Sequence, residues 1–436
     1  MSGVRTFAWF VAGLGAIAVA GMLAEAKDDP HAESRPAAGS VRQGGEPQDK
    51  EPAFAPLPAT LKLPHIERDP DAPDFKRFYG QSGPLQSLPK YDTNNPEASV
   101  DLRSRDASAL DLRTAGADLT PALFDSLTIW PPMDRMPPEY DPARVLEMGK
   151  NPGLGIRRLH AQGITGRGVA IAIVDQTLLT RHVEYAGRLQ WYEEIGVPKT
   201  APSEMHSPAV ASLAVGKTVG VAPGADLFYI GCQPRSMATV LDFYTQGLKR
   251  LLEVDARLPK AHRIRAISIS IGYGPETPGY SDFVAAVRQA EAQGVFVTWC
   301  GDENVRIVGL SIAPAGDRDD FQSYRFPAWM VPASARVKRL PAGIYVPMDA
   351  RTTASPTGVK DYAHYGLGGP SWTVPYLAGA YALAAQVAPD ITPKRFRELA
   401  VKTGRTIQTT VNGQPVEMGA ILDVPALIQA LREGKP

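Results

Sequence analysis

The amino-acid sequence predicts an α/β fold, in which a doubly wound parallel sheet with flanking helices follows a proline-rich extension. The first observation is an unbroken apolar run over residues 169–174 that is rich in valine and isoleucine and is closed by Asp175. Such runs are typical of parallel strands that are buried on both faces. The second observation is that further short apolar runs alternate with longer helical patterns along the rest of the chain. This alternation indicates a parallel sheet covered by helices.

In chain order, a short amphipathic helix is expected over residues 154–161, before the strand at 169–175. The later strands are expected at residues 227–230, 264–271 and 294–299, and the later helices at 209–215, 236–258, 280–293, 371–387 and 392–403. Pro208 suits the first turn of its helix. Residues 301–350 are less regular, with short strands expected near 330–332 and 344–347, and residues 421–431 are expected to pack against or cap the domain.

Composition limits the classes of partner. The chain has 436 residues, enough for one large domain or two ordinary ones. Its 46 basic and 46 acidic residues cancel, so we expect no nucleic-acid partner and no electrostatic capture by an anionic membrane. The two cysteines, Cys232 and Cys300, do not form a disulfide framework.

The N-terminal 26 residues resemble a secretory signal peptide. Arg5 precedes an apolar stretch over residues 7–23, and Ala24-Glu25-Ala26 supplies an A-x-A ending. We therefore expect cleavage before Lys27 and an exported protein, located in the periplasm, the cell envelope or outside the cell. The alternative is an uncleaved membrane anchor, because about 17 apolar residues approach the minimum that spans a bilayer.

The next segments differ in composition from the domain that follows. Residues 27–96 are rich in proline, glycine and charge, which predicts a linker that is partly disordered. Hydrophobic content returns at residues 97–150, which we expect to be an N-terminal extension that packs on the domain formed by residues 151–436. Residues 27–150 together are either a linker with a structural extension or an inhibitory segment that is released later.

Three polar side chains lie at the ends of predicted elements. Asp175 closes the buried strand, His206 begins a helix, and Ser371 follows a Gly-Gly-Pro turn at the start of another helix. Each has an ordinary interpretation as a cap or turn residue. Together they satisfy a chemical requirement, because a serine becomes a nucleophile when an imidazole takes its proton and a carboxylate orients that imidazole.

The segments around these residues follow a recognisable order. Residues 169–177 read V-A-I-A-I-V-D-Q-T, residues 205–211 read M-H-S-P-A-V-A, and residues 369–379 read G-P-S-W-T-V-P-Y-L-A-G. Between them, residues 267–272 read I-S-I-S-I-G and residues 294–302 read G-V-F-V-T-W-C-G-D. In this order and spacing, the segments resemble the motifs of subtilisin-like serine peptidases, the subtilase family. The resemblance extends from about residue 150 to the end.

The resemblance implies a subtilisin-like fold and an exported serine endopeptidase that cleaves polypeptides through an acyl-enzyme intermediate. Asp175, His206 and Ser371 would form the catalytic triad. Asp302 would face the oxyanion, and the substrate backbone would pair with Ser270, Ile271 and Gly272. The resemblance implies no metal and no cofactor in the reaction, and residues 206–221 are too few to hold the calcium loop of many subtilases. We expect a monomer.

Several positions depart from the family pattern. Asp302 stands where the family has an asparagine; an ionised carboxylate there would repel the developing charge, whereas a protonated one could donate. Pro370 replaces the threonine before the serine, and Ser207-Pro208 replaces Gly-Thr. These departures motivate an alternative: a subtilase-fold binding or scaffolding protein of the cell envelope with weak or no catalysis.

Two histidines, one tryptophan and the two cysteines need separate interpretation. His182 and His364 each lie seven residues from a triad position and are rival bases. Trp299 is either a wall of the specificity pocket or a core residue. The subtilase strand order separates Cys232 from Cys300, so we expect no disulfide between them.

Overall fold

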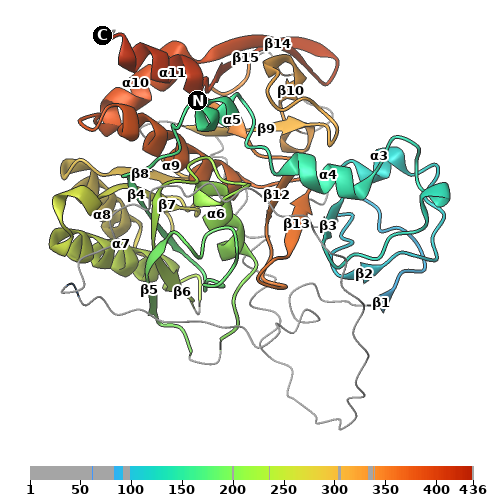
Figure 1. The fold of residues 1–436 in the computed structure, drawn as a ribbon, viewed down its shortest axis with the longest axis horizontal. Coiled ribbons are helices and arrows are strands. Elements are labelled where there is room, and N and C mark those ends of the chain that lie inside the picture. The colour runs from blue at the N-terminus through green and yellow to red at the C-terminus, as the bar shows by residue number, and fades with distance from the viewer. Residues whose placement is uncertain are drawn as a thin grey trace, which may run out of the picture.

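The computed structural model describes residues 61, 83–91, 99–198, 201–234, 236–302, 306–331, 337 and 339–434 (Figure 1). The expected signal peptide and nearly all of the expected linker lie outside these residues. No helix in the described part is both long and apolar enough to cross a membrane.

A parallel sheet of five strands forms the centre of the fold. Its order is β5 (Leu189–Ile195), β6 (Asp226–Cys232), β4 (Ala170–Asp175), β7 (Ile264–Ile269) and β8 (Phe296–Trp299). Every neighbouring pair is parallel. All six residues of the central strand β4 are buried, as expected for an apolar run with both faces covered. The α/β fold with a parallel sheet and helices is therefore confirmed.

Helices cover both faces of this sheet. Ile171 and Ile173 of β4 share a core with α6 (His206–Val215) and α9 (Pro370–Val387). The alternate residues of β4 share a second core with α7 (Val240–Arg257) and α8 (Tyr280–Ala292). Because successive side chains on a strand point to opposite faces, β4 joins the two cores.

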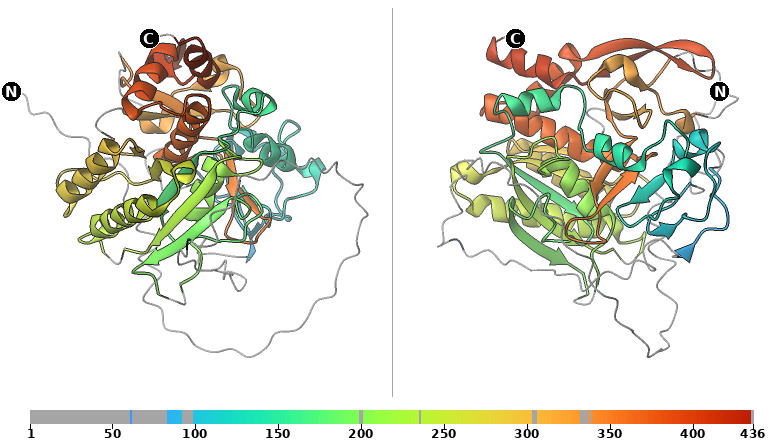
Figure 2. Two further views of the ribbon diagram at one scale, coloured as in Figure 1. Left: turned by 60° about the vertical axis from the view of Figure 1, so that its left-hand side comes forward. Right: turned by 45° about the vertical axis from the view of Figure 1, so that its right-hand side comes forward.

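A second sheet extends the molecule beyond α9. Its order is β10 (Tyr324–Arg325), β9 (Ile307–Ile312), β11 (Ile344–Pro347), β15 (Gln414–Ile421) and β14 (Arg405–Val411). The hairpin β14–β15 lies at the same end of the molecule as α10 (Pro393–Thr403) and α11 (Val424–Arg432) (Figure 2).

Within this part of the chain, the strand expected at 344–347 is confirmed as β11. The prediction of a strand near 330–332 is wrong for residues 330 and 331, and residue 332 lies outside the described residues. A 3₁₀ helix over Ala328–Met330 occupies its start, closed by a hydrogen bond from the Met330 N–H to the carbonyl of Pro327. Three further 3₁₀ helices lie at Met133–Arg135, Lys260–His262 and Phe321–Ser323.

The limits of several predicted elements also change. The helix expected at 236–258 begins only at Val240, and the strand expected at 264–271 ends at Ile269. The helix expected at 209–215 begins three residues earlier, at His206. Residues 154–161 contain the short helix α5 (Ile156–Ala161).

Residues 99–150 contribute to a third sheet, close to the Ser371 turn. β13 (Tyr362–Tyr365) is its central strand and pairs antiparallel with both β12 (Arg351–Ala354) and β3 (Leu123–Asp125). Figure 1 shows this segment beside β12 and β13, with α3 (Gly116–Leu119), α4 (Pro142–Gly149) and the pair of β1 (Gly83–Pro84) and β2 (Arg105–Asp106). The segment has its own small apolar core, in which Val100, Leu102 and Phe124 are buried.

Candidate active site

The last residue of β4 and the first residue of α6 form a hydrogen-bonded pair. His206 Nδ1 lies 2.7 Å from Asp175 Oδ1. The same oxygen accepts from the Gln176 N–H at 2.8 Å and from the Ser207 hydroxyl at 3.4 Å. Because a carboxylate accepts, Nδ1 carries the hydrogen, and the neutral form of the ring has its lone pair on Nε2. His206 is thus oriented as a proton acceptor at Nε2.

Asp175 is a buried carboxylate whose charge affects the pKa values of two nearby cysteines. Its residue is 1% exposed, and its Oδ2 has no hydrogen-bond partner in the described part of the chain. Burial, with a smaller contribution from the Asp175 charge, raises the pKa of the Cys300 thiol to about 12. The same two causes raise the pKa of Cys232. Both cysteines are free, and neither is poised as a thiolate nucleophile.

Ser371 lies in the first turn of α9. Gly369 is the N-cap in an extended conformation, and Pro370 occupies the first helical turn, where its missing N–H costs nothing. The Ser371 hydroxyl donates to the carbonyl of Ser270 at 3.3 Å, and the Ser270 hydroxyl donates to the carbonyl of Ser371 at 3.0 Å. Ser371 therefore sits where the free N–H groups and positive end of an 18-residue helix meet the end of β7.

The residue after Ser371 contacts the ring of His206. Trp372 follows Ser371, and its ring centroid lies 5.3 Å from that of His206 at an interplanar angle of 31°. No hydrogen bond joins His206 Nε2 to Ser371 Oγ in the described residues, because the hydroxyl is turned to Ser270. Rotation about the serine side-chain torsion would be needed to form that bond.

Comparison with known proteins gives evidence on the family of this chain. A family model described as the subtilase family matches residues 166–330, which include Asp175, His206 and the whole central sheet from β4 to β8. This part of the chain belongs to the subtilase family. The chain is also 26% identical over 296 residues to the subtilisin-like protease PopC of Myxococcus xanthus (strain DK1622), a match that covers 58% of this chain. It spans 59% of the length of that relative.

The turn before Ser371 is held by a buried aspartate that was not predicted from the sequence. The Gly368 N–H donates to Asp349 Oδ1 at 2.8 Å, and the Trp329 indole N–H donates to Asp349 Oδ2 at 3.4 Å. Burial raises the pKa of Asp349 to about 6, against the lowering effect of these hydrogen bonds. A Cβ on Gly368 would lie 2.2 Å from the carbonyl oxygen of Met348, so the turn has no room for a side chain there.

Asp302, which was expected to face the oxyanion, lies beside a cation. Arg397 Nη2 is 3.5 Å from Asp302 Oδ2, and the side chain of Asp302 is 2% exposed. Arg397 also pairs with Glu291 and donates to the carbonyl of Val297 at 3.3 Å. A neighbouring guanidinium favours the charged form of a carboxylate, and the charged form accepts hydrogen bonds but cannot donate them.

The segment expected to bind substrate lies just past β7. Ser270 contacts Ser371, as described above, whereas the carbonyl of Ile271 accepts from the Cys300 N–H at 2.9 Å. Trp299 is 3% exposed and packs edge-on against Phe283 at 5.2 Å, inside the second core. This packing favours the interpretation of Trp299 as a core residue.

The two rival histidines belong to other parts of the fold. His182 is fully buried, accepts from the Glu184 N–H at 3.2 Å and has Nε2 at 2.9 Å from the carbonyl of Asp361. His364 lies in β13, and burial lowers its pKa to about 3. Its Nδ1 is 3.1 Å from the Thr352 hydroxyl. Burial also lowers the pKa of His182, so both rings have structural partners and favour the neutral form. The described residues contain no group of three or more His, Cys, Asp or Glu suited to a metal ion.

Proposed function

We propose that the protein is an exported, monomeric serine endopeptidase of the doubly wound, subtilisin-like type, which hydrolyses peptide bonds through Asp175, His206 and Ser371. The observation that carries the proposal is the hydrogen bond of 2.7 Å between His206 Nδ1 and a buried Asp175, with the helix of Ser371 packed on the same imidazole through Trp372. Membership of residues 166–330 in the subtilase family supports the same reaction class.

In the proposed acylation step, the Ser371 hydroxyl turns from the Ser270 carbonyl to His206 Nε2. As its oxygen attacks the peptide carbonyl carbon, its proton passes to His206. Asp175 stabilises the resulting imidazolium. The tetrahedral oxyanion meets the backbone N–H of Ser371 at the positive end of α9. When the intermediate collapses, the C–N bond breaks and His206 returns the proton to the leaving amine.

Deacylation uses the same residues. A water molecule gives a proton to His206 Nε2 and attacks the ester carbon. The bond between this carbon and Ser371 Oγ then breaks, and His206 returns the proton to Oγ, which releases the carboxylic acid and restores the Ser371 hydroxyl. The substrate backbone would lie along Ser270, Ile271 and Gly272 and add a strand next to β7. Polypeptides are therefore the proposed substrate class.

Asp302 makes the proposed enzyme a slow one. By family correspondence it faces the oxyanion, where an ionised carboxylate paired with Arg397 cannot donate. The loss of one oxyanion donor costs about 10²–10³ in rate. The Ser371 N–H would then be the main donor, which leaves catalysis reduced rather than absent.

A second candidate function is a subtilase-fold binding or scaffolding protein of the cell envelope. The observation that favours it is the Ser371 hydroxyl, which donates to Ser270 rather than to His206. In that case Asp175, His206 and Ser371 would serve only in packing. A carboxylate at position 302 would then lower no reaction rate.

The two candidates are separated by labelling the full-length protein with a fluorophosphonate probe across roughly pH 5 to 9, beside Ser371→Ala. The peptidase predicts covalent labelling of the parent and none of the variant. A parent that is folded by circular dichroism but unlabelled at every pH would overturn the peptidase and leave the binding protein.

A further inference from the structure

Arg103 lies far from the proposed triad in the sequence, yet its guanidinium contacts Tyr365, a residue that packs next to two of the triad positions. Arg103 Nη1 donates to the Tyr365 hydroxyl at 3.4 Å, and its guanidinium carbon lies 5.5 Å from the centroid of the Tyr365 ring. We propose that Arg103 is a positioning residue for the active site, acting through Tyr365, and that residues 99–150 are a permanent part of the working enzyme. This inference rests on the proposed function.

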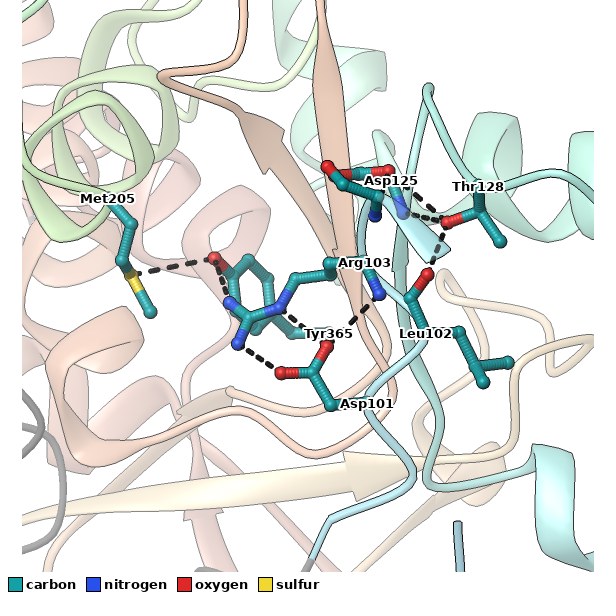
Figure 3. Close-up of polar contacts among 8 residues, drawn as sticks. Asp101, Leu102, Arg103, Asp125, Thr128, Met205 and Tyr365 are labelled. Carbon is teal, nitrogen blue, oxygen red and sulfur yellow. Dashed lines mark hydrogen bonds and ion pairs between the residues drawn. The ribbon is translucent and has the colours of Figure 1, made fainter. Parts of the chain in front are cut away.

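Asp101 holds the side chain of Arg103 in place. Its Nε donates to Asp101 Oδ1 at 2.9 Å and its Nη2 donates to Asp101 Oδ2 at 2.6 Å, a two-point pairing drawn in Figure 3. The Arg103 N–H donates to the same carboxylate at 3.1 Å. The arginine side chain is 9% exposed. The Asp101 side chain is half-buried, at 30% exposed. A bidentate pair has a defined geometry, so the position of Nη1, the remaining nitrogen, is also defined.

The backbone on both sides of Arg103 is held as well. The Thr128 hydroxyl donates to the carbonyl of Leu102 at 2.8 Å. On the other side, the Ser104 N–H and hydroxyl donate to the two oxygens of Asp125 at 2.9 and 2.7 Å. Asp125 is the last residue of β3, and β3 pairs with the strand that carries Tyr365. Arg103 and Tyr365 are thus attached to one sheet.

Tyr365 contacts the neighbours of two triad residues. Its hydroxyl donates to Met205 Sδ at 3.6 Å, and Met205 immediately precedes His206. Its ring packs edge-on against Trp372 at 5.1 Å and 70°, and Trp372 immediately follows Ser371. Trp372 in turn packs on His206. A single buried ring therefore supports the start of α6 and the start of α9.

Both supported positions depend on packing. Met205 is the N-cap of α6 and makes no side-chain capping bond. The Trp372 indole N–H has no hydrogen-bond partner in the described residues, so its neighbouring rings set its orientation. If Arg103 is replaced, the Tyr365 hydroxyl loses a charged hydrogen-bond donor. The first turns of α6 and α9 then lose part of the packing that positions them. A displacement of about 1 Å at such a site can cost about 10²-fold in rate, and we expect about tenfold here.

The test uses saturation labelling of the full-length protein with a fluorophosphonate, which separates the maximal inactivation rate from the probe affinity. We expect Arg103→Gln to lower the maximal rate about tenfold with the apparent affinity changed less than about twofold. Tyr365→Phe keeps the ring and removes the hydroxyl. If Arg103 acts through that hydroxyl, the double variant is no slower than the slower single variant. The proposal would be overturned if the rate losses of the two single variants multiply in the double variant, or if Arg103→Gln labels at the parental maximal rate.

The chain offers a matched control in the same segment. Arg113 forms the same pairing with Asp111, two residues earlier, but on the surface, with the two side chains 63% and 51% exposed. Arg113→Gln should label at the parental rate. If Arg103→Gln does not fold, Arg103→Lys replaces it, because lysine keeps the charge but cannot form the two-point pairing. A parental maximal rate in Arg103→Lys would then overturn the proposal. An unlabelled parent refutes the proposed function itself, whereas a labelled parent with unaffected arginine variants refutes only the positioning role.

Discussion

The ring of Trp372 packs against the ring of His206 with centroids 5.3 Å apart, and so ties the residue after Ser371 to the imidazole that Asp175 orients. The relationship joins α9 to α6 at their N-terminal ends, where the positive ends of both helices come together. A developing oxyanion would be stabilised in such a place.

Trp372 is expected to act through its ring and not through its N–H. Trp372→Ala should destabilise the fold by about 3–5 kcal/mol, since a buried tryptophan is removed. It should also slow fluorophosphonate labelling, because His206 loses its support. Trp372→Phe keeps an aromatic ring and loses an N–H that has no partner, so most of the labelling rate should remain. Thermal unfolding and labelling rates test both variants, and equal rate losses in the two would contradict this account.

Replacing Asp175 tests the orientation of His206. Asp175→Asn keeps the shape but favours the wrong tautomer of the imidazole, so the labelling rate should fall about 10⁴-fold. Ser207→Ala is the matched control, because Ser207 contacts the same carboxylate oxygen at a longer distance, 3.4 Å, and is not needed to orient the ring. Its rate should change less than about threefold. A comparable loss in both variants would point to general disruption of the start of α6.

Asp349 predicts a pH-dependent stability. Burial raises its pKa from 3.8 to about 6, so the folded state holds the proton more tightly than the unfolded state. This stabilising contribution is fully present below about pH 4 and is lost as the pH rises through 6. Asp349→Asn removes the titration. The free energy of unfolding of the variant minus that of the parent should therefore be larger at pH 7 than at pH 4, by up to about 3 kcal/mol.

Urea unfolding of both proteins at the two pH values measures this difference. A gap between variant and parent that does not change with pH would show that Asp349 does not titrate in this window. The asparagine oxygen can still accept from the Gly368 N–H, so Asp349→Asn should label with fluorophosphonate at neutral pH. Loss of labelling would mean that the charge itself is needed to hold the serine turn.

Most of the central sheet could be predicted because its strands are buried runs of valine, isoleucine and alanine. β5 was missed since it is an edge strand that contains Gln190, Glu193 and Glu194. The β14–β15 hairpin was missed because its strands alternate buried and exposed residues without an apolar run. Its turn, Asn412-Gly413, carried a usable signal: both residues have positive φ, as a two-residue hairpin turn requires.

The site could be predicted only where chemistry coincides with an element end. Asp175 ends β4, His206 begins α6 and Ser371 lies in the first turn of α9, so a local pattern identifies each of them as a candidate. Asp349 and the Arg103–Tyr365 contact depend on pairing between distant segments. The register that sets Tyr365 opposite Leu123 joins strands more than 200 positions apart, which no local periodicity reveals.

Asp302 gives the sharpest test of the oxyanion site. Asp302→Asn replaces a carboxylate beside Arg397 with a neutral amide that can donate, and Arg397 keeps its pairing with Glu291. If this position faces the oxyanion, labelling should accelerate about tenfold or more, toward the 10²–10³ associated with one donor. Asp302→Ala removes the charge without adding a donor and should gain less. An Asp302→Asn rate at or below the parental rate, in a folded variant, would mean that the residue does not face the oxyanion and that the Ser371 N–H is unaided by this side chain.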